Sequence, residues 1–432
     1  MRMAEEQRAV AAEVVDVLVA VDVPLARTGS ARDVDRIGGS RARIVREARR
    51  QGAARLRIEG GGTRRAGAVQ VFDHAVYYVS PGGDPMLTRT LGAIAVGLSF
   101  SVCAQDLPKT QFKVIGLNSP TVASIVDEVP FWRETLPKAS NGAISADITP
   151  LDQMGIDDKT MLRLLRLGVM DFAGMDISKM AGDDPRFEGC DLAGITLDAD
   201  KARAGCEAYR SVIDRQMQKN WNARLLAFGG NPPQVFWCRG LLGGLSDLKG
   251  KKVRVFNNTM RDFLGGIGAT AVSMAFAEVV PALNNGVVDC GVTGSLSGNT
   301  AGWPEVTKSL YPMSLGWSIN VMAVNLASWN RLDKRVQNFL LEQVQAYENK
   351  MWTTLKKATA EADNCNTGRQ PCTMGKLAHI TIVPVKPAEA ETHKKLVEGA
   401  VLAGWAKRCG GECAAEWNNT VGKTLGLRAP TN

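Results

Sequence analysis

Segments in which apolar and β-branched residues alternate with polar ones recur along the chain from residue 111 onward. Such alternation predicts half-buried strands, because successive side chains of a strand point to opposite faces. The expected strands are QFKVIGL (111–117), AISADIT (143–149), MDFAGMD (170–176), ARLLAFGG (223–230), PQVFWCRG (233–240), KKVRVFN (251–257) and GVVDCGVT (286–293). The clear alternation in the second of these is typical of a sheet edge or of a strand with one half-buried face.

Helical periodicity fills most of the gaps between these strands. A polar cap before an apolar periodic run marks the start of a helix, and glycine marks its end. Helices are expected over 121–140 with Ser119 or Thr121 as N-cap, over 157–168 ending near Gly168, and in direct succession over 260–270 and from residue 276.

The longest periodic segment runs from Leu332 to Cys365. Its apolar residues recur three and four apart and form one continuous face. A helix of more than thirty residues is long for one globular domain, so we expect it to run across two domains. A proline-bounded strand and a further helix follow in the tail. The alternation of strands and helices predicts an α/β protein with short sheets.

The segment MLTRTLGAIAVGLSFSVCAQ, which begins at Met86, has the pattern of a secretory signal. Arg89 follows an initiator-type Met, an apolar run extends from Leu91 to Val102, and Ala104 offers a cleavage site before Gln105. The run is shorter than the roughly 20 apolar residues that cross a bilayer. The alternative is a buried helix or strand of a cytosolic domain. A lipid anchor on Cys103 is disfavoured because Val102 is bulky.

The composition changes abruptly around this signal. Residues 1–85 contain fourteen Arg and no Lys, whereas every Lys of the chain lies at Lys109 or later. A shift of this kind separates segments with different histories. We therefore interpret 1–85 as a mis-annotated N-terminal extension, 86–104 as the signal peptide and Met86 as the true start. A genuine extra domain over 1–85 is the alternative, because part of this segment has a helical pattern.

The expected mature chain, 105–432, carries a small positive charge, with 37 Lys and Arg against 33 Asp and Glu. It contains no basic stripe interleaved with aromatic residues, so nucleic acid is excluded as a partner. Eight cysteines remain, an even number that fits disulfides in an oxidising compartment. Short and medium loops would be closed by Cys190–Cys206, Cys365–Cys372 and Cys409–Cys413, which leaves Cys238–Cys290 by elimination. A zinc site is the alternative, but no paired CxxC spacing supports it.

Two short motifs resemble fingerprints of enzymes but do not match them. GGIGAT (265–270) has part of a dinucleotide fingerprint, but it follows a helical segment rather than a strand. GSLSG (294–298) has Leu296 where the nucleophile elbow requires Ser. We therefore expect no cofactor, no metal and no catalytic residue. The chain is expected not to be an enzyme.

Three segments within 247–332 carry a family resemblance: DLKGKKVRV, GATAVSMAFAEVVPALNNGVVDCGVTG and WPEVTKSLYPMSLGWSINVMAVNLASWNRL. They resemble the solute-binding proteins of tripartite ATP-independent periplasmic (TRAP) transporters, the DctP-like family. The resemblance implies a two-lobed periplasmic binding protein, type II-like, with hinge strands and a long helix spanning both lobes. Lobe I would comprise 105–236 and 319–358, and lobe II 237–318 and 359–432.

The resemblance also implies which residues hold a carboxylate ligand. Arg254 occupies the carboxylate-binding position, and a planar guanidinium can make two parallel charge-assisted hydrogen bonds to a carboxylate. Arg239 resembles the second cleft arginine, although the loop between the two arginines is short. Asn118 and Asp176 match cleft positions but could equally end a strand or cap a helix, and Thr293 stands where an Asn is common. An apolar wall, or ordinary core, would come from Phe236, Trp237 and Trp317.

The expected function is therefore delivery of a small organic acid, from the periplasm, to the two membrane subunits of a TRAP transporter. The aromatic residues favour a 2-oxo or 2-hydroxy acid over a sugar acid. Two alternatives stay open: a secreted two-lobed enzyme acting on a small carboxylate, and a binding protein that serves a sensor.

Overall fold

The computed structural model describes residues 68–72, 75–79 and 107–431 of the chain. By its internal contacts the chain divides into two units, 1–103 and 104–432. In the first unit, β1 (Ala68–Phe72) pairs with β2 (Ala75–Val79) in an antiparallel hairpin. The predicted signal peptide, 86–104, lies outside the described residues. The fold that follows is that of the second unit.

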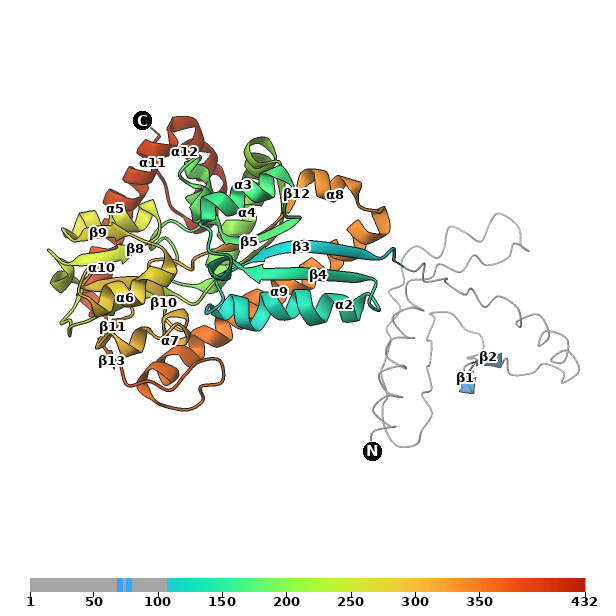
Figure 1. Ribbon diagram of the computed structural model, residues 1–432, viewed down its shortest axis with the longest axis horizontal. Helices are drawn as coiled ribbons and strands as arrows, with labels where there is room; N and C mark the ends of the chain where they lie inside the picture. Colours follow the sequence, from blue (N-terminus) through green and yellow to red (C-terminus); the bar gives the residue numbers. More distant parts are fainter. Residues whose placement is uncertain (1–67, 73–74, 80–106, 432) are drawn as a thin grey trace, which may run out of the picture. The chain divides into compact units, whose positions relative to one another are not determined.

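A five-stranded sheet forms the centre of what we call the first lobe (Figure 1). The order of the strands in this sheet is β4 (Ile144–Pro150), β3 (Thr110–Gly116), β5 (Phe172–Asp176), β12 (Asn320–Asn325) and β6 (Ala223–Gly229). The β3 strand pairs in parallel with β4 and β5, whereas β12 runs antiparallel to β5 and β6. The strands predicted over 111–117, 143–149, 170–176 and 223–230 are thus confirmed, and β4 is an edge strand as its alternation indicated.

Helices cover both faces of this sheet. Helical residues run continuously from Val122 to Ala139, and the Thr121 hydroxyl accepts a hydrogen bond from the Ser124 amide at 3.3 Å, which confirms Thr121 as the cap. The α3 helix (Asp158–Leu167) ends at Gly168, whose φ of 72° is a left-handed conformation that glycine tolerates.

One long helix of the first lobe was not predicted. The α4 helix (Ala199–Trp221) begins within the loop that the Cys190–Cys206 disulfide closes. Its buried residues recur three and four apart from Ala202 to Met217, but small and charged residues dilute that signal.

A six-stranded sheet forms the centre of the second lobe. The order of the strands in this sheet is β13 (Thr381–Ile382), β11 (Ser309–Tyr311), β7 (Gln234–Cys238), β10 (Cys290–Gly294), β8 (Lys252–Val255) and β9 (Thr270–Ser273). The β10 strand runs parallel to β8 and antiparallel to β7. The predicted lobe boundary after residue 236 falls inside β7, all of which belongs to this sheet.

The edge strand β9 corrects the expectation of two helices in direct succession. The helix α5 (Asn258–Ile267) ends at Gly268, and β9 then precedes α6 (Val279–Asn284). The four residues of β9 are exposed or half-buried, so they carry little apolar pattern. The short length of β9 and its polar ends explain why the sequence did not predict it.

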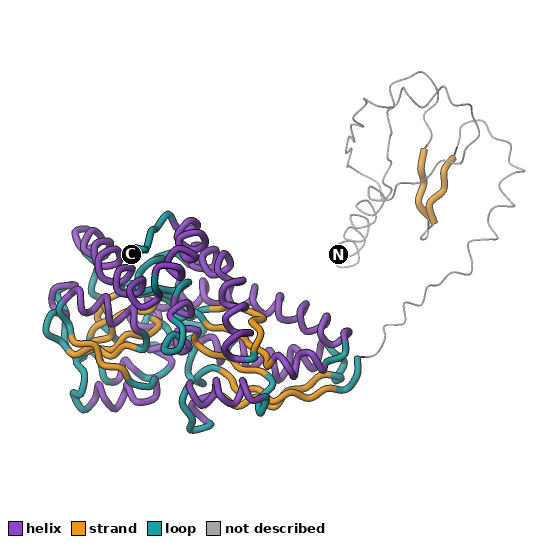
Figure 2. The backbone as a smooth tube through the Cα atoms, turned by 90° about the horizontal axis from the view of Figure 1, so that it is seen from above, coloured by secondary structure: helices purple, strands orange, loops and turns teal. Residues whose placement is uncertain are grey.

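One long helix runs across both lobes. The predicted long helix is confirmed as α9 (Lys334–Thr367), which packs on β6 of the first lobe and on β13 of the second. Figure 1 shows it in orange, running from one sheet to the other, and Figure 2 shows helices on the outer faces of both sheets. Further helices, from α10 (Pro387–Leu396) to residue 425, pack against both α5 and α4.

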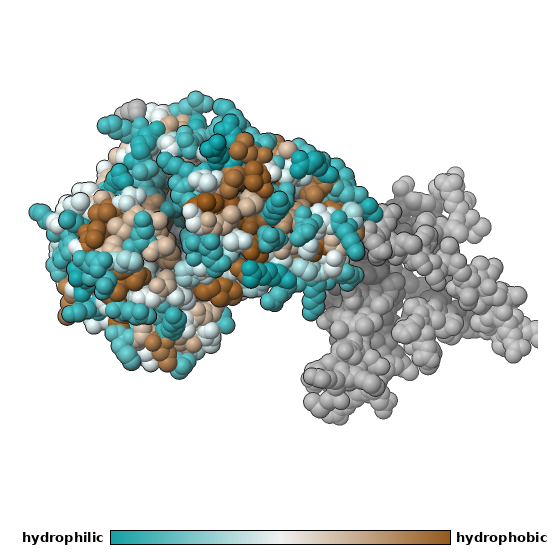
Figure 3. Space-filling model, in the orientation of Figure 1, coloured by the Kyte–Doolittle hydropathy of each residue, from teal (hydrophilic) through white to brown (hydrophobic). Residues whose placement is uncertain are grey.

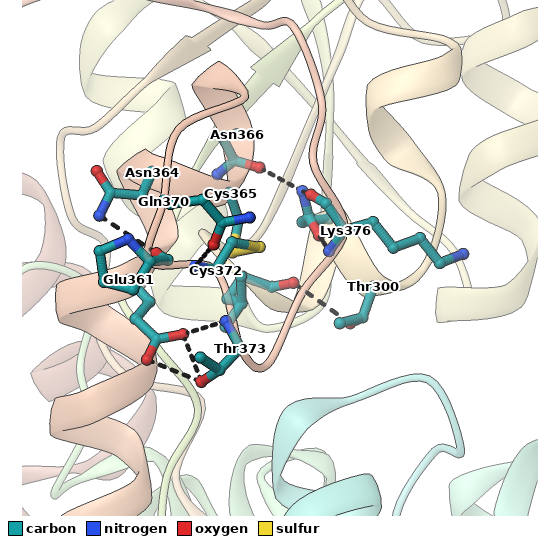
Figure 4. The surroundings of a disulfide bond; sticks show 12 residues. Thr300, Glu361, Asn364, Cys365, Asn366, Gln370, Cys372, Thr373 and Lys376 are labelled. Atoms are coloured by element: carbon teal, nitrogen blue, oxygen red, sulfur yellow. Dashed lines mark hydrogen bonds between the residues drawn. A yellow bond between two sulfur atoms is a disulfide. The ribbon is translucent and has the colours of Figure 1, made fainter.

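All four predicted disulfides are confirmed. Cys238 and Cys290 lie directly opposite each other on β7 and β10. Cys365 and Cys372 close a seven-residue turn at the end of α9, where Glu361 accepts hydrogen bonds from Thr373 (Figure 4). The other two bonds join Cys190 to Cys206 and Cys409 to Cys413.

The hydropathy of the surface and of the helices was compared with what a membrane span requires. On the face drawn in Figure 3, hydrophobic residues form separate patches between hydrophilic ones. Among the residues that the structure describes, no helix combines the length and the apolar character needed to cross a bilayer.

Candidate functional site

A cavity lies between the two lobes, at the edges where their strands meet. The first lobe contributes the ends of β3, β5 and β12, and the second contributes the ends of β7, β8 and β10. Its volume is about 70 Å³, which is room for roughly five water molecules and hence for a small organic molecule. Crevices outside strand ends are where open α/β sheets bind ligands.

Arg254 forms the charged wall of this cavity on the second lobe. Its side chain is only 2% exposed and extends from the middle of β8. Nη1 donates to the main-chain oxygen of Val292 at 2.9 Å, while Nη2 and Nε donate to that of Met274 at 3.2 and 3.3 Å. Because a guanidinium has five N–H groups, one donor on each terminal nitrogen is left for a ligand.

Two aromatic rings hold the guanidinium from the sides. The central carbon of Arg254 lies 5.3 Å from the ring centre of Phe256 and 5.9 Å from that of Phe276. Both rings line the cavity and supply the apolar wall that the sequence had assigned to other residues. Phe256 follows Arg254 by two residues, and this spacing along a strand could have indicated it.

The charge of Arg254 has no carboxylate partner at contact distance. In the described part of the chain, no ion pair within 4 Å involves this residue, and its three bonds go to neutral carbonyls. Burial lowers the pKa of Arg254 to about 10, although the charges of Asp176, Asp158 and Glu278 oppose that shift. The group is therefore still cationic at neutral pH. A buried cation without a carboxylate partner is a favourable place for an anion.

Three further predicted residues line the cavity with Arg254. Asp176 ends β5, caps the following turn by accepting from the Ser178 amide at 2.8 Å, and accepts from the Ser318 hydroxyl at 2.5 Å. Asn118 follows β3, and Thr293 lies on β10. Asp176 is thus both a turn cap and a cavity residue, so the two interpretations of it do not exclude each other.

Lys179 and Asp158 also line the cavity, and the sequence did not indicate them. Lys179 Nζ lies 3.7 Å from an oxygen of Asp158 and 5.6 Å from the centre of the Phe256 ring. Burial raises the pKa of Asp158, while the charge of Lys179 acts in the opposite direction. The two residues come from a helix start and a turn, positions at which charged residues are common and carry no signal of their own.

The predicted second arginine lies elsewhere. Arg239 is exposed beyond the end of β7 and lines a separate surface hollow with Asp289 and Lys308. The reason is strand direction: β7 runs opposite to β8, so its last residues lie at the far edge of the sheet. The residue of β7 at the cavity edge is its first, Gln234, which lines the cavity.

The three aromatic residues expected at the site are core residues. Phe236 packs near Tyr311, with ring centres 6.1 Å apart, and Trp237 packs near Trp303 at 6.3 Å. β7 is an interior strand, so both of its faces are buried. Trp317 is also buried, and its indole nitrogen donates to the Thr196 hydroxyl at 3.0 Å. None of the three is among the residues that line the cavity.

Direct contacts join the lobes beside the cavity. The Thr300 hydroxyl, on a helical turn after β10, donates to the main-chain oxygen of Pro120 at 2.6 Å. Val122 and Leu296 pack with Cys365 at the end of α9 in a small apolar cluster. The cavity is therefore bounded on one side by a contact between the two lobes.

Two α/β lobes with a long helix across both, and a buried arginine in the cavity between them, define a solute-binding protein. The sequence assigns it more narrowly, since the profile of bacterial extracellular solute-binding protein family 7, DctP, matches residues 97–398. The chain belongs to this family, and the predicted resemblance to TRAP solute-binding proteins is confirmed.

Individual relatives show the same relationship at low identity. The sialic acid-binding periplasmic protein SiaP of Vibrio cholerae is 26% identical over 278 residues, 63% of this chain and 85% of that protein. The C4-dicarboxylate-binding periplasmic protein DctP of Rhodobacter capsulatus is 27% identical over 291 residues, which cover 66% of this chain and 82% of that protein. A TRAP periplasmic solute-binding protein from Desulfovibrio salexigens, solved with orotic acid, superimposes with a TM-score of 0.65 at 18% identity. The superposition covers 73% of this chain and 98% of that protein.

Proposed function

We propose that this protein binds a small organic acid in the cavity between its lobes, with the ligand carboxylate on Arg254. The observation that carries the proposal is the state of the Arg254 guanidinium. It is buried, cationic and fixed by main-chain oxygens, and it keeps one N–H free on each terminal nitrogen. Two parallel N–H donors match the two oxygens of a carboxylate.

The names of the relatives support an acidic ligand. SiaP is named for sialic acid, DctP for C4-dicarboxylates, and the Desulfovibrio salexigens protein was solved with orotic acid. All three ligands are carboxylic acids, although they differ in size and in charge.

The charges of the cavity favour a monocarboxylate. Arg254 and Lys179 are the cationic residues that line it, and Asp158 and Asp176 are the anionic ones. Lys179 already lies near Asp158, so a second ligand carboxylate would meet no unpaired cation. The aromatic residues behind the preference for a 2-oxo or 2-hydroxy acid lie in the core, so they give no support to that preference.

For its cellular role, we propose export by the signal that begins at Met86, followed by delivery of the ligand to the two membrane subunits of a TRAP transporter. The lobes would carry the ligand without turnover, since the family and the named relatives are solute-binding proteins. We propose the lobe boundaries given from the sequence, with one change: all of β7 belongs to the second lobe.

Calorimetry of the purified mature chain tests the binding step. A panel of monocarboxylates is titrated beside their methyl esters, which keep the shape but lack the charge. We expect at least one acid to bind at micromolar affinity and its ester to bind at least tenfold more weakly. Equal binding of acid and ester, or no binding by any acid, would reject the proposal. Chemical conversion of the bound acid over time would instead favour the alternative that the protein is a secreted two-lobed enzyme.

A further inference from the structure

A pair of buried amide side chains joins the end of α9 to a short helix beside the cavity, α7 (Ser297–Thr300). Asn299 is 1% exposed, and its Nδ2 donates to Oδ1 of Asn366 at 2.9 Å and to the main-chain oxygen of Lys376 at 2.8 Å. Its Oδ1 accepts from the Lys376 amide at 2.7 Å. Asn366 in turn donates to the main-chain oxygen of Ser295 at 2.8 Å. Because both hydrogens of the Asn299 amide are used, its side chain has one fixed orientation.

The partners of Asn299 belong to a constrained part of the chain. We call residues 365–376 the disulfide turn, because the Cys365–Cys372 bond closes most of it (Figure 4). A cross-link of this kind restricts the conformations that a loop can adopt. A Cβ on Gly375 of the turn would lie 2.8 Å from Oδ1 of Asn299, so the turn and α7 are in close contact. Asn299 therefore fixes α7 to a segment that has little freedom of its own.

The last residue of α7 contacts the opposite lobe. The Thr300 hydroxyl donates to the main-chain oxygen of Pro120 at 2.6 Å. Pro120 lies in a turn in which the Thr121 amide donates to the main-chain oxygen of Asn118 at 3.1 Å. Asn118 and Thr121 line the cavity from the first lobe, and Ser297 of α7 lines it from the second. The bond from Thr300 to Pro120 therefore holds two walls of the cavity together on this side.

We propose that Asn299 is a positioning residue of the ligand site and that it acts through Thr300. Asn299 is not among the residues that line the cavity. It fixes α7 against the disulfide turn and so places the Thr300 hydroxyl on Pro120. The inference rests on the proposed function, because the cavity whose walls are held is the proposed ligand site. Walls that already have the binding geometry lose less free energy when the ligand arrives, so loss of this contact weakens binding.

A positioning role differs from a purely structural one in where its effects occur. If Asn299 only stabilised the second lobe, its removal would loosen α7 and the disulfide turn and leave the first lobe unaffected. If Asn299 acts through Thr300, its removal also loosens the turn around Pro120 in the first lobe. Amide hydrogen exchange reports such local opening segment by segment.

Hydrogen exchange of the mature chain without ligand, followed by mass spectrometry, tests the contact. Thr300→Val removes the hydroxyl but keeps the β-branched shape, and Asn299→Ala removes the amide. Each should speed exchange of the first-lobe peptide 117–125 by about three- to tenfold, the factor expected for one lost hydrogen bond. The double variant should exchange no faster than the faster single variant, because both changes break one contact. Asn285→Ala, exposed at the end of α6 in the same lobe, is the matched control and should have no effect there.

The opposite results would overturn the inference. Unchanged exchange of 117–125 in both folded single variants would show that the contact does not couple the lobes. Additive effects in the double variant would show that Asn299 does not act through Thr300. If Asn299→Ala does not fold, Asn299→Ser replaces it.

Calorimetry with lactate, pyruvate and benzoate connects the contact to binding. Every acid that binds the parent protein should bind Asn299→Ala and Thr300→Val about three- to tenfold more weakly, and Asn285→Ala with unchanged affinity. Unchanged affinity in the first two variants would reject the positioning role and leave the carboxylate proposal standing. Failure of every carboxylate to bind the parent protein would reject the proposed function, while the exchange rates would still decide whether Asn299 and Thr300 couple the lobes.

Discussion

Arg254 donates from Nη1 to the main-chain oxygen of Val292 at 2.9 Å, a bond that joins β8 to β10 beneath the cavity. With the two bonds to Met274, it fixes the plane of the guanidinium before any ligand arrives. A preorganised donor pair loses little entropy on binding, so most of its interaction with a carboxylate contributes to affinity.

This arrangement predicts a large effect of Arg254→Lys. Lysine keeps the charge but cannot provide a fixed pair of donors. Loss of a hydrogen bond to a charged group costs about 1.5–3 kcal/mol, so the affinity for the carboxylate ligand should fall at least tenfold by calorimetry. The melting temperature of the empty protein should also fall, because the bonds to Val292 and Met274 are lost or weakened.

Arg239→Lys is the matched control for that substitution. Arg239 is exposed at the far edge of the same sheet and lines a different hollow. Its replacement should leave affinity unchanged within experimental error. If Arg239→Lys reduced the affinity as much as Arg254→Lys, the result would show that Arg239 also contacts the ligand.

The raised pKa of Glu128 predicts how the free energy of unfolding depends on pH. Glu128 is buried behind the cavity wall, where one oxygen accepts from the Leu117 amide at 2.6 Å, and burial raises its pKa from 4.5 to about 8. The folded protein therefore holds this proton when the unfolded chain has lost it. The resulting stability is complete below pH 4.5 and is lost as the pH rises to about 8, by at most about 1.4 kcal/mol per pH unit.

Glu128→Gln removes this titration while keeping an acceptor for Leu117. Between pH 5 and pH 8, the melting temperature of the variant should fall less than that of the parent protein. Part of the slope should remain in both proteins, since burial also raises the pKa of Glu188 to about 7 and that of Asp191 to about 8. Parallel profiles for parent and variant would show that Glu128 is ionised in the fold.

Gly174 lies where the packing of Glu128 leaves no room for a side chain. A Cβ placed on this residue of β5 would lie 1.8 Å from an oxygen of Glu128. Gly174→Ala should therefore displace that carboxylate and destabilise the protein by about 1–3 kcal/mol, as overpacking of a core does. Gly182→Ala is the control, because its Cβ would meet no atom within 4 Å. Equal denaturation midpoints for the two variants would contradict the packing around Glu128.

The disulfides predict a graded loss of stability. Cys238 and Cys290 are 52 residues apart, whereas Cys365 and Cys372 are seven apart. By loop-closure entropy, replacing the first pair by Ala should cost about 4 kcal/mol and replacing the second about 2.5 kcal/mol. Urea denaturation of the two double variants measures the difference. A larger loss for the short loop would show that local packing outweighs chain entropy.

Much of the fold could be predicted from the sequence, because periodicity reports local structure directly. The strand around Arg254 carries alternating apolar residues, and the long helix α9 carries apolar residues three and four apart. Helix α4 and strand β9 were missed for opposite reasons: α4 mixes its apolar face with small and charged residues, while β9 is a short, exposed edge.

The site was predictable only where the relevant information is local. Arg254 is polar within an apolar strand, and that contrast is visible in the sequence. Arg239 and Trp237 were placed incorrectly because their positions depend on the direction and sheet order of β7, which are tertiary properties. Asn231 and Asn320 also line the cavity, but the sequence did not indicate them, because their unpaired atoms exist only after folding.

The most direct test of the central claim is a crystal structure of the mature protein with its carboxylate ligand. We predict that both carboxylate oxygens lie about 3 Å from Nη1 and Nη2 of Arg254, which still donates to Val292 and Met274. A ligand whose carboxylate pairs with Lys179 or with solvent, leaving the Arg254 nitrogens without contact to it, would contradict the account.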